Sequence, residues 1–296
     1  MLPAVAKLCC GISYPHLRSM TGLQRVAVAA LGQEISHRHQ TGQIPIPAWA
    51  SCVRWSWGNN SEEVERGKGQ RDRVNKTDLS YQHQGQQALQ TALEIVQDAE
   101  GWRMEMSEES GDTIYSKVLH GNRKVFRLEA ELEASPEELY DILFVKVEEM
   151  HQWNPSIRHI KILKHVGQET KITHEVSAET VGNLIGQRDF LSVRHSLKMQ
   201  NCIYLGGAAT HLESFPPHPE FVRAEDGPTC IIIRPSPNGT GKSRFTWLLN
   251  MDVKGWIPKS LVNQALPRAQ VDFTAHLRRR LAAGGKKTAA AADTRP

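Results

Sequence analysis

The chain has 296 residues, of which 40% are hydrophobic, and it carries a formal net charge of +4 at pH 7. A chain of this length and composition can bury one large hydrophobic core or two modest ones. Its longest purely apolar run, residues 26–31, is far shorter than the ~20 residues that a transmembrane helix needs. The sequence therefore predicts no helix that crosses a membrane.

Charge is distributed unevenly along the chain. Residues 1–61 carry five cations and one anion, and residues 258–296 carry eight cations and two anions. The intervening residues 62–257 hold 23 Lys and Arg against 29 Asp and Glu, so this part is acidic. Because the body of the chain has a net negative charge, we expect no nucleic-acid partner.

Residues 1–62 have the character of a mitochondrial transit peptide. Arg18 and Arg25 lie seven residues apart beside an apolar helical face, and Glu34 is the one acidic residue before residue 62. A secretory signal would need an uninterrupted apolar core of ~7–15 residues, which polar residues break here. A disordered basic tail is the alternative interpretation. Residues 63–76, rich in charge and glycine, predict a polar linker.

No metal site, cofactor site or catalytic residue is predicted. The five cysteines include no Cys-x-x-Cys pair, and the histidines between residues 151 and 195 have no metal-binding spacing. The segment Asn238–Ser243 is similar to a phosphate-binding loop, but that pattern requires glycine at the position of Ser236 and a following helix. A Trp-containing strand follows instead. The segment is therefore interpreted as a hairpin turn.

From Thr77 onward the pattern is that of an α+β domain. A helix is predicted over residues 78–97, and a second helix from the N-cap Ser135 to about Met150. Alternating apolar residues predict strands over residues 113–119, 124–133, 157–166, 169–178, 187–198, 201–212, 221–225, 229–234 and 243–253. Strands at this spacing are typical of one antiparallel sheet that curls to bury a face.

The segment after Pro258 predicts one long amphipathic helix. Arg278, Arg279 and Arg280 lie near its end, where cations suit the helix dipole. Its apolar residues recur every three or four positions and form one stripe, namely Val262, Leu266, Ala269, Phe273, Leu277 and Leu281. We expect this helix to cover the open face of the sheet.

Pro267 interrupts the pattern of this helix. A proline inside a helix removes one backbone hydrogen bond and clashes with the preceding turn, so we expect a bend near residues 263–267. The folded domain is expected to span residues 77–283. Residues 284–296 are expected to form a disordered tail.

Two charged residues lie inside predicted strands. Glu175 and Arg194 would be stable in a buried position only as a hydrogen-bonded pair, because an isolated buried charge costs several kcal/mol. At the end of an apolar cavity, such a pair would offer a donor and an acceptor to one lipid hydroxyl. The alternative is that both are exposed strand charges.

Several segments of this chain resemble mitochondrial START-domain cholesterol transfer proteins. The resemblance covers nearly the whole chain, including residues 24–34 of the leader. It is carried by the segments Ile172–Glu175, Gly182–Phe190, Ser192–Arg194, Arg223–Glu225, Gly227–Cys230 and Lys254–Ser260. The sequence departs from the family at Asp226, where family members have histidine, so no ligand role is assigned to this residue.

The resemblance implies a helix-grip fold, in which a curved antiparallel sheet of about nine strands surrounds a lipid cavity and a long C-terminal helix forms the lid. It implies that Glu175 and Arg194 bind the ligand and that Arg188 supports the cavity or the fold. The lid residues would be Leu266, Phe273, Leu277 and Leu281.

The resemblance also implies the function. The protein would be a non-enzymatic cholesterol carrier in mitochondria that promotes movement of cholesterol from the outer to the inner membrane for steroid hormone synthesis. Its partners would be cholesterol, the outer membrane surface and the import machinery, and it would act as a monomer without a cofactor.

Two other functions remain open at this stage. A mitochondrial enzyme with a helix-grip cavity would need a proton-transfer group, and we expect Arg194 to lower the pKa of Glu175 and make it a poor base. A membrane-surface scaffold without a ligand is the second alternative.

Overall fold

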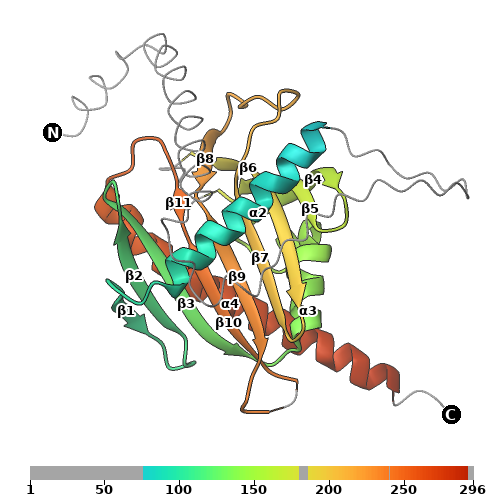
Figure 1. Cartoon of the computed structure of the whole chain (residues 1–296). Helices are drawn as coiled ribbons and strands as arrows, with labels where there is room; N and C mark the ends of the chain where they lie inside the picture. Colours follow the sequence, from blue (N-terminus) through green and yellow to red (C-terminus); the bar gives the residue numbers. More distant parts are fainter. Residues whose placement is uncertain (1–75, 180–185, 240, 293–296) are drawn as a thin grey trace, which may run out of the picture. The chain divides into compact units, whose positions relative to one another are not determined.

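The computed structural model describes residues 76–179, 186–239 and 241–292 of the chain (Figure 1). All of them belong to one compact unit, Arg71–Pro296. The predicted transit peptide over residues 1–62, and the predicted linker as far as residue 75, lie outside the described residues.

The centre of the domain is one sheet with the strand order β1-β2-β3-β10-β9-β7-β6-β5-β4. Neighbours along this path are antiparallel, β8 pairs with β6 in parallel, and β11 pairs with β8. The strands are β1 Arg103–Ser107, β2 Thr113–Leu119, β3 Arg123–Leu132, β4 Ile157–Val166, β5 Thr170–Ser177, β6 Arg188–Met199, β7 Cys202–Ala209, β8 Val222–Asp226, β9 Thr229–Pro235, β10 Ser243–Leu249 and β11 Met251–Asp252. This confirms the predicted α+β class and the antiparallel main sheet. In the described residues, the sheet has eleven strands where about nine were expected, and it is not closed, because β1 and β4 lie at its two ends.

The strand predictions differ from the structure at β1, which was not expected. Four of its five residues are exposed, including Met104, so β1 has no alternation between buried and exposed side chains. It pairs only with β2 at the edge of the sheet. Met104 and Met106 alternate with polar residues, but a five-residue run at the edge of the sheet in which only Met106 is partly buried gives a weak sequence signal.

Helix α2, Lys76–Gln97, lies across one face of the sheet (Figure 1). It approaches the sheet closely because glycines lie at two of the contact points. Gly85 of α2 lies against His195 of β6, and Gly206 of β7 lies against Leu89 of α2. A Cβ atom at Gly206 would be 2.6 Å from the Cβ of Leu89. Side chains of α2 and the sheet form a small core here, made of Leu89, Ala92, Val125, Cys230, Ile232 and Leu248.

The segment after β3 begins as predicted but does not continue as one α-helix. Ser135 caps α3, Pro136–Tyr140, by accepting a hydrogen bond from the Glu138 backbone N–H at 3.2 Å. The chain then widens into the π-helix η3, Asp141–Val145, and tightens into the 3-10 helix η4, Val147–Gln152. The expected single helix to Met150 is therefore wrong.

Tertiary contacts explain this change of winding. Three consecutive side chains of η3, from Ile142 to Phe144, are buried. In a regular α-helix on a sheet, buried residues recur every three or four positions, so three in a row are harder to bury. The Nζ of Lys171 on β5 donates a hydrogen bond to the Phe144 carbonyl at 2.8 Å. A sheet residue thus satisfies a backbone carbonyl of η3.

Helix α4, Lys259–Ala292, lies on the face of the sheet opposite α2 (Figure 1). It runs through Pro267 and ends at Ala292, beyond the predicted domain boundary at residue 283, so that boundary does not coincide with the end of the helix. The bend at Pro267 stays a prediction. The main core lies between the sheet, η3, η4 and α4, and includes Phe126, Leu128, Leu143, Phe144, Ile233, Phe245, Leu266, Phe273, Leu277 and Leu281.

Candidate functional site

A cavity of about 380 Å³ lies between the sheet and α4. Ligand sites for small molecules have volumes of roughly 300–1,000 Å³ and mostly apolar walls. The walls here come from η3, η4, α4 and strands β4 to β11, and are mostly apolar. The cavity is therefore suited to a largely apolar ligand.

The helix α4 contributes Leu266, Ala269 and Phe273 to the cavity wall. The ring of Phe273 packs between two tryptophans, with centroid distances of 4.8 Å to Trp247 and 5.5 Å to Trp153. Such offset aromatic contacts add to the energy of apolar burial. Phe273 thus fixes this part of α4 against β10 and the segment after η4.

The other two predicted lid residues do not line the cavity. Leu277 is 0% exposed and Leu281 is 7% exposed, and both belong to the core further along α4. The predicted stripe therefore has two parts: one that covers the cavity and one that holds the helix on the domain.

Glu175 and Arg194 come together at the cavity wall. The Nη2 of Arg194 donates to Oε2 of Glu175 at 2.9 Å, and its Nε donates to Oγ1 of Thr173, also at 2.9 Å. Side chains two residues apart on a strand share a face, so Thr173 and Glu175 both point to the cavity side of β5. The interpretation of two exposed strand charges is excluded, whereas ligand contact by this pair stays a prediction.

The accessible surface of this pair lies inside the cavity. The side chains of Glu175 and Arg194 are 22% and 27% exposed, and both line the cavity wall. Burial raises the pKa of Glu175, and the nearby Arg194 offsets only part of that effect. The expectation that Arg194 makes the carboxyl a weak base by lowering its pKa is therefore wrong, because removal from water has the larger effect.

Asp226, to which the sequence assigned no ligand role, is one of four charged residues that line the cavity wall in the described part of the chain, with Glu175, Arg188 and Arg194. Its Oδ2 accepts a hydrogen bond from Oγ of Ser192 at 2.9 Å, and burial raises its pKa. The contact depends on the parallel pairing of β8 with β6. Alternation along β6 could have indicated that Ser192 shares a face with Arg194, but no local signal places Asp226 beside them.

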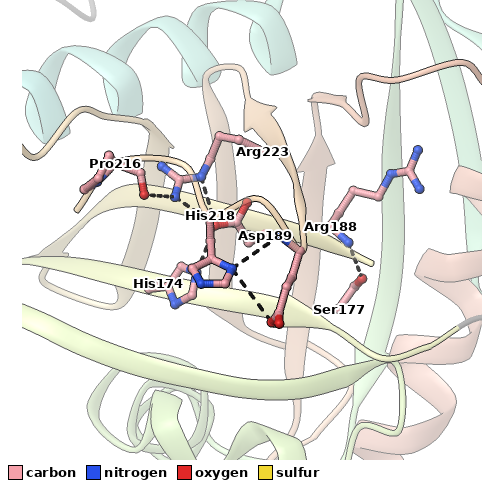
Figure 2. Close-up of polar contacts among 8 residues, drawn as sticks. His174, Ser177, Arg188, Asp189, Pro216, His218 and Arg223 are labelled. Atoms are coloured by element: carbon pink, nitrogen blue, oxygen red, sulfur yellow. Dashed lines mark hydrogen bonds and ion pairs between the residues drawn. The ribbon is translucent and has the colours of Figure 1, made fainter. Parts of the chain in front are cut away.

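Arg188 supports the segment that leads into α4. It lines the cavity and is 8% exposed. Its Nε donates to the Val253 carbonyl at 3.2 Å and its Nη2 to the Lys254 carbonyl at 3.3 Å. Its backbone N–H donates to Oγ of Ser177 at 3.0 Å (Figure 2). Arg188 therefore joins β5, β6 and the start of the lid, in agreement with a supporting role.

A second polar cluster lies on the other face of β5 and β6, away from the cavity wall (Figure 2). Oδ2 of Asp189 lies 3.0 Å from Nε2 of His174 and accepts two hydrogen bonds from Arg223, at 3.0 and 2.8 Å. Arg223 also donates to the Pro216 carbonyl at 3.4 Å, and the ring of Phe215 lies 4.5 Å from the ring of His174. The cluster fastens the 210–221 segment to the sheet. No sequence pattern predicted this cluster.

Among residues 76–179, 186–239 and 241–292, no group of three or more His, Cys, Asp or Glu side chains could hold a metal ion. In the same residues, no helix combines the length and apolar character needed to span a membrane.

Comparison with known proteins places this site in a family. Residues 82–287 match the family model of the START domain. The chain is 44% identical to a zebrafish (Danio rerio) protein named "Steroidogenic acute regulatory protein, mitochondrial", over 99% of this chain and 100% of that protein. It is 43% identical to the bovine (Bos taurus) protein of the same name, over 95% of this chain and 96% of that protein.

A solved structure agrees with the fold. Human StAR-related lipid transfer protein 5 aligns with a TM-score of 0.62 at 18% identity, covering 68% of this chain and 96% of that one. At this identity the likeness shows the fold alone. The family model and the full-length relatives together show that the chain belongs to the START domain family, within the group of steroidogenic acute regulatory proteins.

Proposed function

We propose that this protein binds cholesterol and promotes its movement from the outer to the inner mitochondrial membrane, where it supplies steroid hormone synthesis. The names of the zebrafish and bovine relatives, which contain the words steroidogenic and mitochondrial, support this role and location. The START domain is a lipid-binding fold, which favours transfer of an unchanged lipid over an enzymatic reaction.

The observation that carries the proposal is a mostly apolar cavity with one ion pair in its wall. Burial of sterol rings against such walls supplies roughly 25 cal/mol per Å² of apolar surface. Glu175 and Arg194 offer an acceptor and a donor to the sterol hydroxyl, which fixes the orientation of the ligand. Apolar contacts therefore supply most of the binding free energy, and the polar pair determines how the sterol is oriented in the cavity.

The proposed lid is the N-terminal half of α4, where Leu266 and Phe273 cover the cavity. Its movement away from the sheet would let sterol enter. Arg279 is exposed near the far end of α4, and such cations attract anionic lipid by about 1 kcal/mol each. We therefore place the open state at the outer membrane surface.

The remaining partners follow from the parts of the chain. Residues 1–62 would be the transit peptide that the mitochondrial import machinery recognises. Residues 63–76 would be a linker, and residues 77–283 would be the lipid-binding domain. Residues 284–296 are not needed for the cavity. The protein would act as a monomer, since one domain provides the complete cavity wall.

The experiment is a transfer assay between vesicles. The full chain is mixed with donor vesicles that contain labelled cholesterol and acceptor vesicles that contain cardiolipin, and the label in the acceptor is measured with time. The wild type should accelerate transfer, whereas Arg194→Leu should lose most of the acceleration. Lys198→Leu, which removes an exposed cation from the same strand, is the matched control and should transfer normally. Equal rates with and without the wild-type protein would refute the proposal.

A further inference from the structure

The polar part of the cavity has more hydrogen-bond acceptors than a single hydroxyl group can satisfy. Oε2 of Glu175 and Oδ2 of Asp226 have partners, in Arg194 and Ser192 respectively. Among the described residues, Oε1 of Glu175 and Oδ1 of Asp226 accept no hydrogen bond, and neither atom is sealed from the cavity. Two carboxyl oxygens are therefore available to a ligand.

A sterol with one hydroxyl group can donate one hydrogen bond. It can satisfy Glu175 or Asp226 but not both, while its oxygen accepts from Arg194. The second carboxyl oxygen then remains in an apolar cavity without a donor. A buried acceptor that loses its partner is costly, because it gives up its hydrogen bonds to water. A ligand with a second donor at the right distance would remove this cost.

The geometry of the strands limits where that second donor must lie. Ser192 and Arg194 are two residues apart on β6, so they share a face and are separated by about 7 Å along the strand. Asp226 is bound to Ser192 and Glu175 is bound to Arg194. The two free carboxyl oxygens therefore lie in the same part of the cavity, within reach of two hydroxyl groups on neighbouring sterol rings.

We propose that Asp226 is a second ligand-contacting residue and that, with Glu175, it makes this cavity prefer sterols that carry two hydroxyl groups on the ring system over cholesterol. This inference rests on the proposed function, because it places the first sterol hydroxyl at Glu175 and Arg194. Asp226 then determines specificity among sterols.

The side-chain end of the sterol provides an internal comparison. A hydroxyl at the end of the sterol side chain would lie far from Asp226 when the ring hydroxyl is at Glu175. Such a diol gains nothing from Asp226, although it has the same number of donors as a ring diol. The preference is therefore for the position of the second hydroxyl and not for polarity in general.

The experiment is competition binding to the full chain. Labelled cholesterol is displaced by unlabelled cholesterol, by 7α- or 7β-hydroxycholesterol as ring diols, and by 25-hydroxycholesterol as the side-chain diol. In the wild type, at least one ring diol should displace the label at a roughly five- to ten-fold lower concentration than cholesterol, the effect of about one net hydrogen bond. The side-chain diol should show no such gain.

Variants assign the preference to Asp226. Asp226→Leu should bind cholesterol and ring diols alike, because the second acceptor is gone. The matched control is Glu225→Leu, which removes the neighbouring carboxylate that pairs with Lys254 on the surface and should keep the preference. If Asp226→Leu does not fold, Asp226→Ala removes the same acceptor with less bulk and should likewise abolish the preference.

The outcomes separate this inference from the proposed function. A wild type that binds no sterol contradicts the proposed function. A wild type that binds cholesterol but no ring diol more tightly overturns this inference alone, as does a preference that survives in both Asp226 variants.

Discussion

Arg278 and Asp112 fasten α4 to the β1–β2 turn: Nη1 of Arg278 donates to Oδ2 of Asp112 at 2.7 Å. Asp112 is 1% exposed and also accepts a hydrogen bond from Oγ1 of Thr274 at 2.7 Å. One turn earlier, Nε2 of Gln270 donates to the Trp247 carbonyl at 3.1 Å. In the described residues, the side-chain hydrogen bonds from α4 to the rest of the domain come from residues 268–278. The two kinds of contact overlap, because the cavity-lining residues Leu266, Ala269 and Phe273 lie partly within this stretch. The buried charged contact to Asp112 lies beyond them, toward the C-terminal end of α4.

We therefore predict that Asp112→Ala loosens the lid. Loss of a buried carboxylate with charged partners should lower the free energy of unfolding by about 2–3 kcal/mol. Release of bound sterol should become faster because α4 loses its fixed end. Chemical denaturation and a sterol release assay measure the two effects.

Glu108→Ala is the control for this prediction, since Glu108 pairs with Arg268, whose side chain is 57% exposed. Exposed pairs contribute at most about 1 kcal/mol. Equal losses of unfolding free energy in Asp112→Ala and Glu108→Ala would contradict the role of Asp112 in holding α4.

A second prediction concerns Leu277 of α4, whose side chain is fully buried in the core but does not line the cavity. Leu277→Ala should lower the free energy of unfolding by about 2–5 kcal/mol, because it leaves a cavity in the core. Leu261→Ala, at a position that is 54% exposed, should change it by less than about 0.5 kcal/mol. Urea titrations of both variants test this, and a stable Leu277→Ala protein would show that this part of α4 is not needed for the fold.

A third prediction concerns the loss of Arg194. Arg194→Leu removes the ion-pair partner of Glu175 and leaves this carboxyl close to Asp226, so stability at pH 7.5 should fall by up to about 3 kcal/mol. Both carboxyls already have raised pKa values through burial, and removal of the cation raises them further. The deficit relative to wild type should shrink as the pH falls toward 5, because the carboxyls take up protons. A deficit that does not change with pH would argue against buried carboxyls as its cause.

A fourth prediction concerns buried histidine. His195 is 3% exposed, its Nδ1 lies 2.8 Å from Oγ1 of Thr170, and burial lowers its pKa below the usual 6.5. The unfolded chain therefore binds more protons than the folded one below pH 6.5. The stability that neutral His195 contributes is present above pH 6.5 and is lost as the pH falls from 6.5 through the lower pKa of the folded state. His174, whose pKa is also lowered by burial, adds to this slope.

Urea midpoints at pH 7.5, 6.5 and 5.5 measure this slope. His195→Gln should flatten it between pH 6.5 and 5.5, whereas substitution of the exposed His151 should leave it unchanged. An unaltered slope in His195→Gln would assign the pH dependence to other groups.

Local patterns predicted most of the strands. β2 and β4 begin and end at the predicted residues, because turns with glycine or asparagine bound an alternating run on each side. The N-cap at Ser135 was predicted for the same reason: the signal is contained in four neighbouring residues. Features with a local physical cause could thus be read from the chain.

The rest depends on contacts between distant residues. The π-helix after Tyr140 exists because three consecutive side chains are buried and Lys171 reaches a carbonyl of η3. Asp226 meets Ser192 because β8 joins the sheet in parallel, which alternation along either strand does not encode. The raised pKa of Glu175 likewise depends on burial by elements far along the chain, which outweighs the effect of its nearest cation.

A domain that transfers cholesterol without changing it should carry one intact sterol molecule. The most direct measurement is mass analysis of lipids extracted from the full-length protein after incubation with cholesterol-containing vesicles and re-purification. We expect cholesterol at about one molecule per chain in the wild type and far less in Arg194→Leu. Recovery of no sterol, or of a chemically altered one, from the folded wild-type protein would contradict it.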